Sequence, residues 1–93
     1  MQRIVINICY GGFGLSEEAE SRYREITGEY WPMFRWEVKR DDPMLIRVIE
    51  ELGDKASGKY ADLKIVEIPD GVQWQIDEYD GNEWVAEQHR TWR

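Results

Sequence analysis

Residues 10–16, Tyr-Gly-Gly-Phe-Gly-Leu-Ser, combine the residue types that can hold an anionic ligand. Glycines allow neighbouring backbone N–H groups to converge on one anion, and a helix beginning at Ser16 would add partial positive charge. The spacing matches neither the G-x-G-x-x-G motif of dinucleotide folds nor the phosphate loop with its Lys and Ser or Thr. Glu17 and Glu18 follow at once and repel a bare phosphate unless they turn away. The alternative interpretation is a purely structural turn.

Aromatic and basic residues extend this candidate site. Tyr10 and Phe13 flank the glycines, and stacking on a base contributes about 1–3 kcal/mol. The C-terminal tail adds planar donors and a further ring. The alternative for the tail is a solvated chain end with Trp92 docked on the core. The predicted ligand-binding residues are Tyr10, Gly11, Gly12, Phe13, Gly14, Ser16, His89, Arg90, Trp92 and Arg93.

Cys9 and His89 are the residues on which a catalytic hypothesis would rest. Cys9 would end a strand just before a helix, where a thiolate is favoured, and His89 would act as its base. Nothing in the sequence brings the two together, and a lone Cys closing an apolar strand is typical of a small buried residue. With one Cys and one His, and without calcium-loop spacing at residues 77–83, we expect no metal and no cofactor.

Carboxylates dominate the last third of the chain. Residues 62–87 contain eight carboxylates and a single basic residue, Lys64. The carboxylates are Asp62, Glu67, Asp70, Asp77, Glu78, Asp80, Glu83 and Glu87. Such a surface can imitate nucleic-acid phosphates and occupy a basic protein. The alternative is a solvated face that protects an edge strand from pairing with other chains.

The elements that position these residues follow from local patterns. Residues 3–9 are rich in β-branched side chains and predict a strand, with Ile4, Ile6 and Ile8 on one face. An apolar face of this kind is typical of a sheet that helices cover on that side. A helix is predicted from the N-cap Ser16 to a stop at Gly28.

Alternating residues predict a second strand near 34–39. The next helix is predicted between the cap Asp42, with Pro43 at its first position, and Gly53. Strands at 63–68, at 72–79 and from 83 to about 89 follow. They are separated by turns, of which Asp80-Gly81 is a strong hairpin signal.

The resulting order, β-α-β-α-β-β-β, predicts a single α+β domain over residues 1–93. We expect a mixed sheet with two helices on one face, a parallel pairing of the first two strands, and a C-terminal antiparallel meander. A chain of 93 residues buries one core and no deep private cleft. Because five tryptophans are hard to bury together, we expect some at a ligand surface or at the subunit interface of a homo-oligomer.

Composition restricts the partners. The net charge of −7 argues against a basic groove for nucleic acid. No segment approaches the roughly 20 apolar residues that cross a bilayer, and the start of the chain lacks the pattern of a signal peptide. A lone cysteine is typical of the reducing cytosol. We therefore expect a cytoplasmic protein without a membrane or nucleic-acid partner.

Three segments resemble a family of small proteins encoded by phages and prophages. They are CYGGFGLS at 9–16, the stretch from DDP to PDGV at 41–72, and the stretch from IDEYDG to the tryptophan at 76–92. The match covers most of the chain except residues 30–37. The resemblance implies a context, a small cytoplasmic accessory protein acting in an infected cell, and no catalytic or binding residues follow from it.

Together these observations predict a non-enzymatic homo-oligomer that sequesters a small anionic, nucleotide-derived ligand and so counters host defence signalling. The first alternative is an acidic inhibitor that binds a host protein through the last third of the chain. The second alternative is an enzyme that uses Cys9 and His89.

Overall fold

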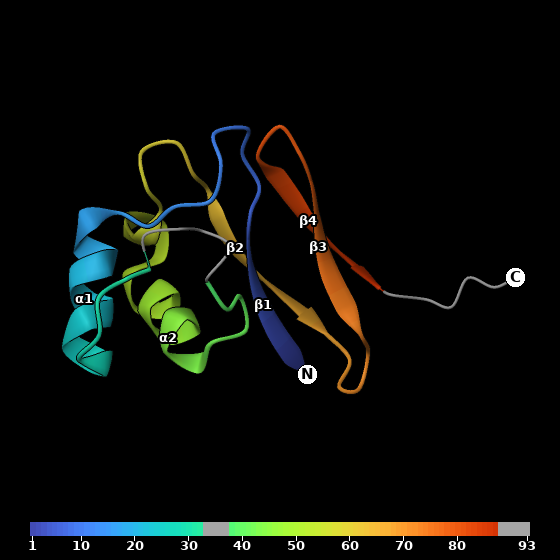
Figure 1. Ribbon diagram of the computed structural model, residues 1–93, viewed down its shortest axis with the longest axis horizontal. Helices are drawn as coiled ribbons and strands as arrows, with labels where there is room; N and C mark the ends of the chain where they lie inside the picture. The colour runs from blue at the N-terminus through green and yellow to red at the C-terminus, as the bar shows by residue number, and fades with distance from the viewer. Residues whose placement is uncertain (33–37, 88–93) are drawn as a thin grey trace, which may run out of the picture.

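The computed structural model describes residues 1–32 and 38–87 of the chain. Within them the elements follow the order β-α-α-β-β-β, so the α+β class is confirmed (Figure 1). The elements are β1 (Gln2–Asn7), α1 (Glu17–Thr27), α2 (Pro43–Leu52), the 3-10 helix η2 (Gly53–Ala56), β2 (Leu63–Ile68), β3 (Trp74–Tyr79) and β4 (Asn82–Glu87). The strand predicted at 34–39 lies mostly outside the described residues, and Val38 and Lys39 are not in a strand.

The strands pair differently from the expected mixed sheet. β1 pairs antiparallel with β2, with Gln2 opposite Ile68 and Asn7 opposite Leu63. β3 pairs antiparallel with β4, as the hairpin signal predicts. In the described part of the chain the result is two separate antiparallel pairs, with no pairing between β2 and β3. The expected meander is therefore wrong at the step from β2 to β3.

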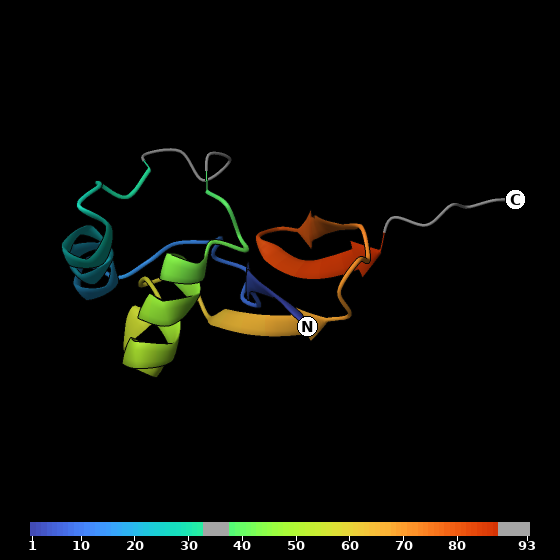
Figure 2. The same ribbon diagram turned by 90° about the horizontal axis from the view of Figure 1, so that it is seen from below.

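The chain turns away after β2 because Gln2 holds the connection between β2 and β3. Its side-chain amide donates to Pro69 O and to Val72 O, both at 3.0 Å, and its Oε1 accepts from Trp74 Nε1 at 3.2 Å. Pro69 also lacks the N–H that a continuing ladder would need. The β3–β4 hairpin consequently lies on one side of β1 and the two helices on the other (Figures 1 and 2).

β1 is buried on both faces, and the helices cover the face opposite to the expected one. Val5 packs in the helical core, whereas Ile4 and Ile6 are buried outside it. Side chains alternate along a strand, and Gln2, on the isoleucine face, reaches the hairpin. The hairpin therefore covers Ile4 and Ile6. Ile8 lies beyond the end of β1 and is 42% exposed.

Both helices begin at their predicted caps. Ser16 Oγ accepts from Ala19 N at 3.1 Å, and Gly28 ends α1 in the left-handed region with φ +76°. Asp42 Oδ1 accepts from Met44 N at 2.9 Å at the start of α2. The helical core consists of Val5, Leu15, Ala19, Tyr23, Leu45, Ile46, Val48, Ile49 and Ala56. None of the helices described is long and apolar enough to cross a membrane.

Aromatic residues lie in this core and beside it. Burial, with a 3.0 Å hydrogen bond to Asp42, raises the pKa of Tyr23 to about 12. The Tyr23 ring meets Trp31 edge-on, with 5.1 Å between ring centroids. Trp31 and Trp74 are half-buried, while Trp84 on β4 is 48% exposed. Trp36 and Trp92 lie outside the described residues.

Candidate functional site

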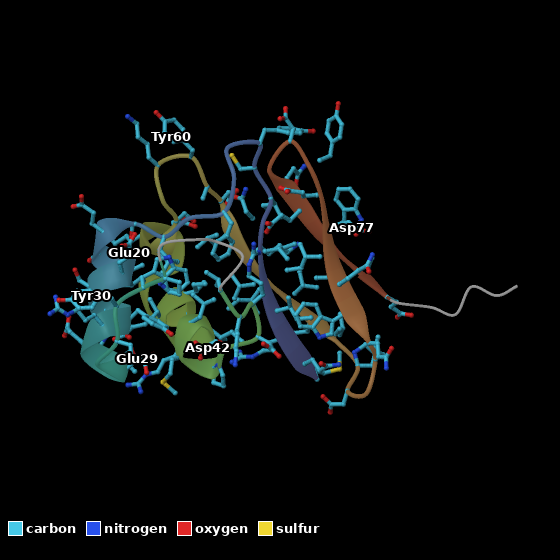
Figure 3. The ribbon with its side chains drawn as sticks, in the orientation of Figure 1. Glu20, Glu29, Tyr30, Asp42, Tyr60 and Asp77 are labelled. Atoms are coloured by element: carbon cyan, nitrogen blue, oxygen red, sulfur yellow. The ribbon has the colours of Figure 1, made fainter. Side chains whose placement is uncertain are left out.

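Three loops meet at one end of the molecule, which we call the loop end: residues 8–14, 58–62 and 79–82. The first follows β1 and the second precedes β2, so the antiparallel pairing of β1 with β2 places both at one end. The turn from β3 to β4 lies beside them, where Gly81 O accepts from Asn7 (Figure 1). Figure 3 shows Tyr60 at this end, whereas Glu29 and Asp42 lie at the far end of the helical side. The glycine run singled out by sequence is one of the three loops.

Asn7, the last residue of β1, joins the three loops and is fully buried. Its Nδ2 donates to Cys9 O and to Gly81 O, both at 2.7 Å, and its Oδ1 accepts from Asp62 N at 2.7 Å. One side chain thus uses three of its hydrogen-bonding positions on three different loops. The sequence offered no signal for this role, because a single Asn at a strand end has many ordinary uses.

A buried ion pair holds the hairpin against β1. Arg40 donates from both terminal nitrogens to Glu83, at 2.7 and 2.9 Å, and the side chains are 11% and 4% exposed. Glu83 also accepts from Asn7 N at 2.8 Å, and Arg40 donates to Val5 O at 3.2 Å. The Phe13 ring lies under the guanidinium, 3.8 Å from ring centroid to Cζ. The expectation that Glu83 belongs to an exposed acidic surface is therefore wrong.

The glycines permit backbones to approach closely where the loops meet. A Cβ on Gly11 would lie 1.9 Å from Tyr60 O, and one on Gly81 would lie 2.7 Å from Gly12 N. A Cβ on Gly58 would lie 3.1 Å from Gly14 O. At Gly11 the structural interpretation of the glycine run is thus sufficient, because no side chain fits there.

This contact predicts different effects at two glycines of the same loop. Gly11→Ala places a methyl group against the Tyr60 backbone, and we expect it to lower the free energy of unfolding by about 1–3 kcal/mol. Gly14→Ala is the matched control, because a Cβ there meets nothing within 4 Å and its φ is not positive. We expect it to stay within about 0.5 kcal/mol of the unmodified protein in urea unfolding. Equal stabilities of the two variants would contradict the contact.

Several predicted ligand groups already have partners inside the protein. Ser16 Oγ donates to Lys55 O at 2.6 Å while accepting from the helix, and Ser16 N donates to Ala56 O at 2.9 Å. Phe13 is half-buried and also stacks on Trp31, with 6.4 Å between centroids. Within the described residues, the structure shows no hydrogen bond from the N–H groups of residues 11–14. His89, Arg90, Trp92 and Arg93 lie outside the described residues.

Cys9 has a defined neighbour in the structure. It is half-buried, and its Sγ lies 3.5 Å from Tyr60 O in hydrogen-bonding geometry. The expected base, His89, lies outside the described residues. Among residues 1–32 and 38–87, no group of three or more His, Cys, Asp or Glu side chains is arranged to hold a metal ion.

The surface of the loop end is aromatic and acidic. A shallow hollow of about 460 Å³ lies between residues 10–12 and the turn from β3 to β4. Its lining is Tyr10, Gly11, Gly12, Glu78, Tyr79, Asp80 and Gly81. Three tyrosines at this end are 65–71% exposed, and Asp62 and Asp80 are exposed with them. The carboxylates beside the glycines favour a cation in this hollow over an anion.

Other carboxylates of the last third are engaged elsewhere. The N-terminal ammonium group lies 3.2 Å from Asp70. Glu67 stands opposite Arg3 in the β1–β2 register, and Asp77 accepts from Gln75 at 2.9 Å. The acidic surface therefore lacks Glu83 and is divided: Asp62, Glu78 and Asp80 are exposed at the loop end, whereas Glu67, Asp70 and Glu87 are exposed elsewhere.

No family model, curated protein or solved structure matches this chain.

Proposed function

We propose that this protein is a non-enzymatic binding protein whose loop end binds a basic surface of a partner protein. The observation that carries the proposal is the hollow between residues 10–12 and 78–81, which joins two exposed tyrosines to exposed carboxylates. Tyrosine supplies large contact area with few rotatable bonds, and exposed carboxylates steer a basic partner into place. The resemblance to phage-encoded proteins adds that the partner is a protein of the host cell.

A contact at the same end supports this choice of partner. Lys59 Nζ lies 5.4 Å from the centroid of the Tyr60 ring, so a tyrosine of the loop end already faces a cation. An arginine or lysine of a partner would find the same type of surface on Tyr10 and Tyr79, which are 65% and 71% exposed. The rigid setting favours binding, because the loops are joined through buried Asn7 before any partner arrives.

The experiment compares two double variants with the same net charge. Asp62→Asn with Asp80→Asn neutralises the loop end, and asparagine tolerates the φ of +54° at position 80. Glu18→Gln with Glu20→Gln removes two exposed carboxylates from α1 and is the control. In titrations with an oligoarginine peptide near 0.15 M salt, we expect the first variant to weaken binding about fivefold or more relative to the control. Equal losses would mean that net charge alone attracts the peptide.

A second candidate is the small anionic, nucleotide-derived ligand. One observation favours it: in the described residues the N–H groups of residues 11–14 have no acceptor in the protein, and Tyr10 is free to stack on a base. A second measurement decides between the two: the stability of the protein is compared with and without a panel of cyclic and ADP-ribose-type nucleotides. A nucleotide-binding protein gains about 2.7 kcal/mol of stability at a hundredfold excess over Kd, whereas a binder of basic proteins gains none.

A further inference from the structure

Among the strands that the structure describes, none covers the edge of β2 that faces away from β1. Val5 N donates to Arg40 O at 2.8 Å, so the backbone of Val5 points away from β2. Ile65 stands opposite Val5, and in an antiparallel pair the backbone of such a residue also points outward. By the same alternation, the N–H and C=O groups of Leu63 and Glu67 face outward with those of Ile65.

Two of the three outward N–H groups have no partner in the part of the chain that the structure describes. Leu63 N donates to Ser57 Oγ at 3.0 Å. For Ile65 and Glu67 the structure shows no acceptor within residues 1–32 and 38–87. The edge is six residues long, and four of its side chains are apolar and half-buried: Leu63, Ile65, Val66 and Ile68. An apolar edge of this length is a template for strand addition.

We propose that a second copy of this chain covers the edge, with β2 pairing antiparallel to its own counterpart. A two-fold axis beside Ile65 places Ile65 opposite Ile65 and Leu63 opposite Glu67 of the other copy. Both unpaired N–H groups of each copy, at Ile65 and Glu67, then gain a carbonyl acceptor. The product is a four-stranded antiparallel sheet in the order β1-β2-β2-β1.

Charge favours a second copy as the occupant. The edge carries one lysine and one glutamate, Lys64 and Glu67, and is locally neutral although the chain carries −7. Antiparallel pairing places the start of one β2 beside the end of the other. The acidic loop end adjoins the start of β2, so the two loop ends point in opposite directions. Six residues of strand separate them by about 20 Å, which exceeds the screening length of about 8 Å.

The dimer goes beyond the proposed partner binding and does not depend on it. Asp62→Asn with Asp80→Asn changes the loop end and leaves β2 untouched. That variant should keep its dimer and lose its affinity for the basic peptide. Failure of either proposal is thus visible without the other.

The test removes one outward N–H group and leaves the β1–β2 ladder intact. Glu67→Pro deletes the donor at position 67, and Glu67→Ala is the control that loses the same side chain but keeps the N–H. We expect the intact chain and Glu67→Ala to have twice the monomer mass in light scattering after size exclusion. Glu67→Pro should raise the dimer dissociation constant about tenfold or more, because each two-fold dimer loses two hydrogen bonds.

Hydrogen exchange keeps the test decisive if Glu67→Pro misfolds. In the intact chain, we expect the amides of Ile65 and Glu67 to exchange more slowly as protein concentration rises through the dimer dissociation constant. A monomer at every concentration, or a dimer in which these two amides exchange freely, overturns the proposal. A complex whose mass is not twice that of the chain means that a different strand covers the edge, which overturns it as well.

Discussion

Glu83→Ala lowers the free energy of unfolding by about 3–5 kcal/mol, the largest effect we expect from a single side-chain truncation in this protein. The substitution leaves the Arg40 guanidinium at 11% exposure without its carboxylate and removes the acceptor of Asn7 N. Removing one partner of a buried pair costs this much because the remaining charge stays desolvated. Urea unfolding followed by tryptophan fluorescence measures it.

A control and a rescue separate the buried charge from other effects of Glu83. Glu87→Ala removes an exposed carboxylate from the same strand and should change stability by less than about 0.5 kcal/mol. Arg40→Met combined with Glu83→Leu removes both charges and replaces them with apolar volume, so it should lose clearly less than Glu83→Ala. If the double variant is no more stable than the single one, packing rather than the uncompensated charge explains the loss.

We expect the second large loss of stability from Asn7→Asp, which replaces one N–H₂ group by an oxygen at the centre of the loop end. The new carboxylate oxygen faces Cys9 O and Gly81 O at the 2.7 Å distances where an N–H₂ group now donates. The carbonyls of Cys9 and Gly81 lose their donor, and the buried charge gains no donor beyond Asp62 N, which Asn7 already has. We expect a loss of about 3 kcal/mol or more in urea unfolding at neutral pH.

The pH dependence of Asn7→Asp identifies the cause. We expect burial beside two carbonyls to raise the pKa of the new carboxyl in the folded state above its unfolded value, because both disfavour the charged form. A group with a raised folded pKa favours the folded state at low pH and loses that contribution as pH rises. The loss of stability caused by Asn7→Asp should therefore become smaller as pH falls toward 4 and below. Asn82→Asp makes the same change at the half-buried first residue of β4 and should show a smaller loss of stability. A deficit of Asn7→Asp that does not change with pH would contradict this account.

Local structure was predictable because its causes are local. The helix caps form hydrogen bonds with residues two or three positions away, as Ser16 and Asp42 do. Gly28 ends α1 through its own left-handed backbone conformation. The β3–β4 turn follows from Asp80-Gly81, because both residues have the positive φ that a type I′ hairpin turn requires. The sequence by itself therefore determined the α+β class, both helices and the hairpin.

Tertiary structure alone decided which strands pair and which residues build the site. Gln2 redirects the chain after β2 through bonds to Pro69 and Val72, which are 67 and 70 positions away. Arg40 and Glu83 look like ordinary surface charges in sequence, 43 positions apart. Their burial depends on where the hairpin lies, and no local pattern contains that information. Asn7 likewise becomes the centre of the loop end only because β1–β2 pairing brings residue 62, and the position of the hairpin brings residue 81, within reach of its side chain.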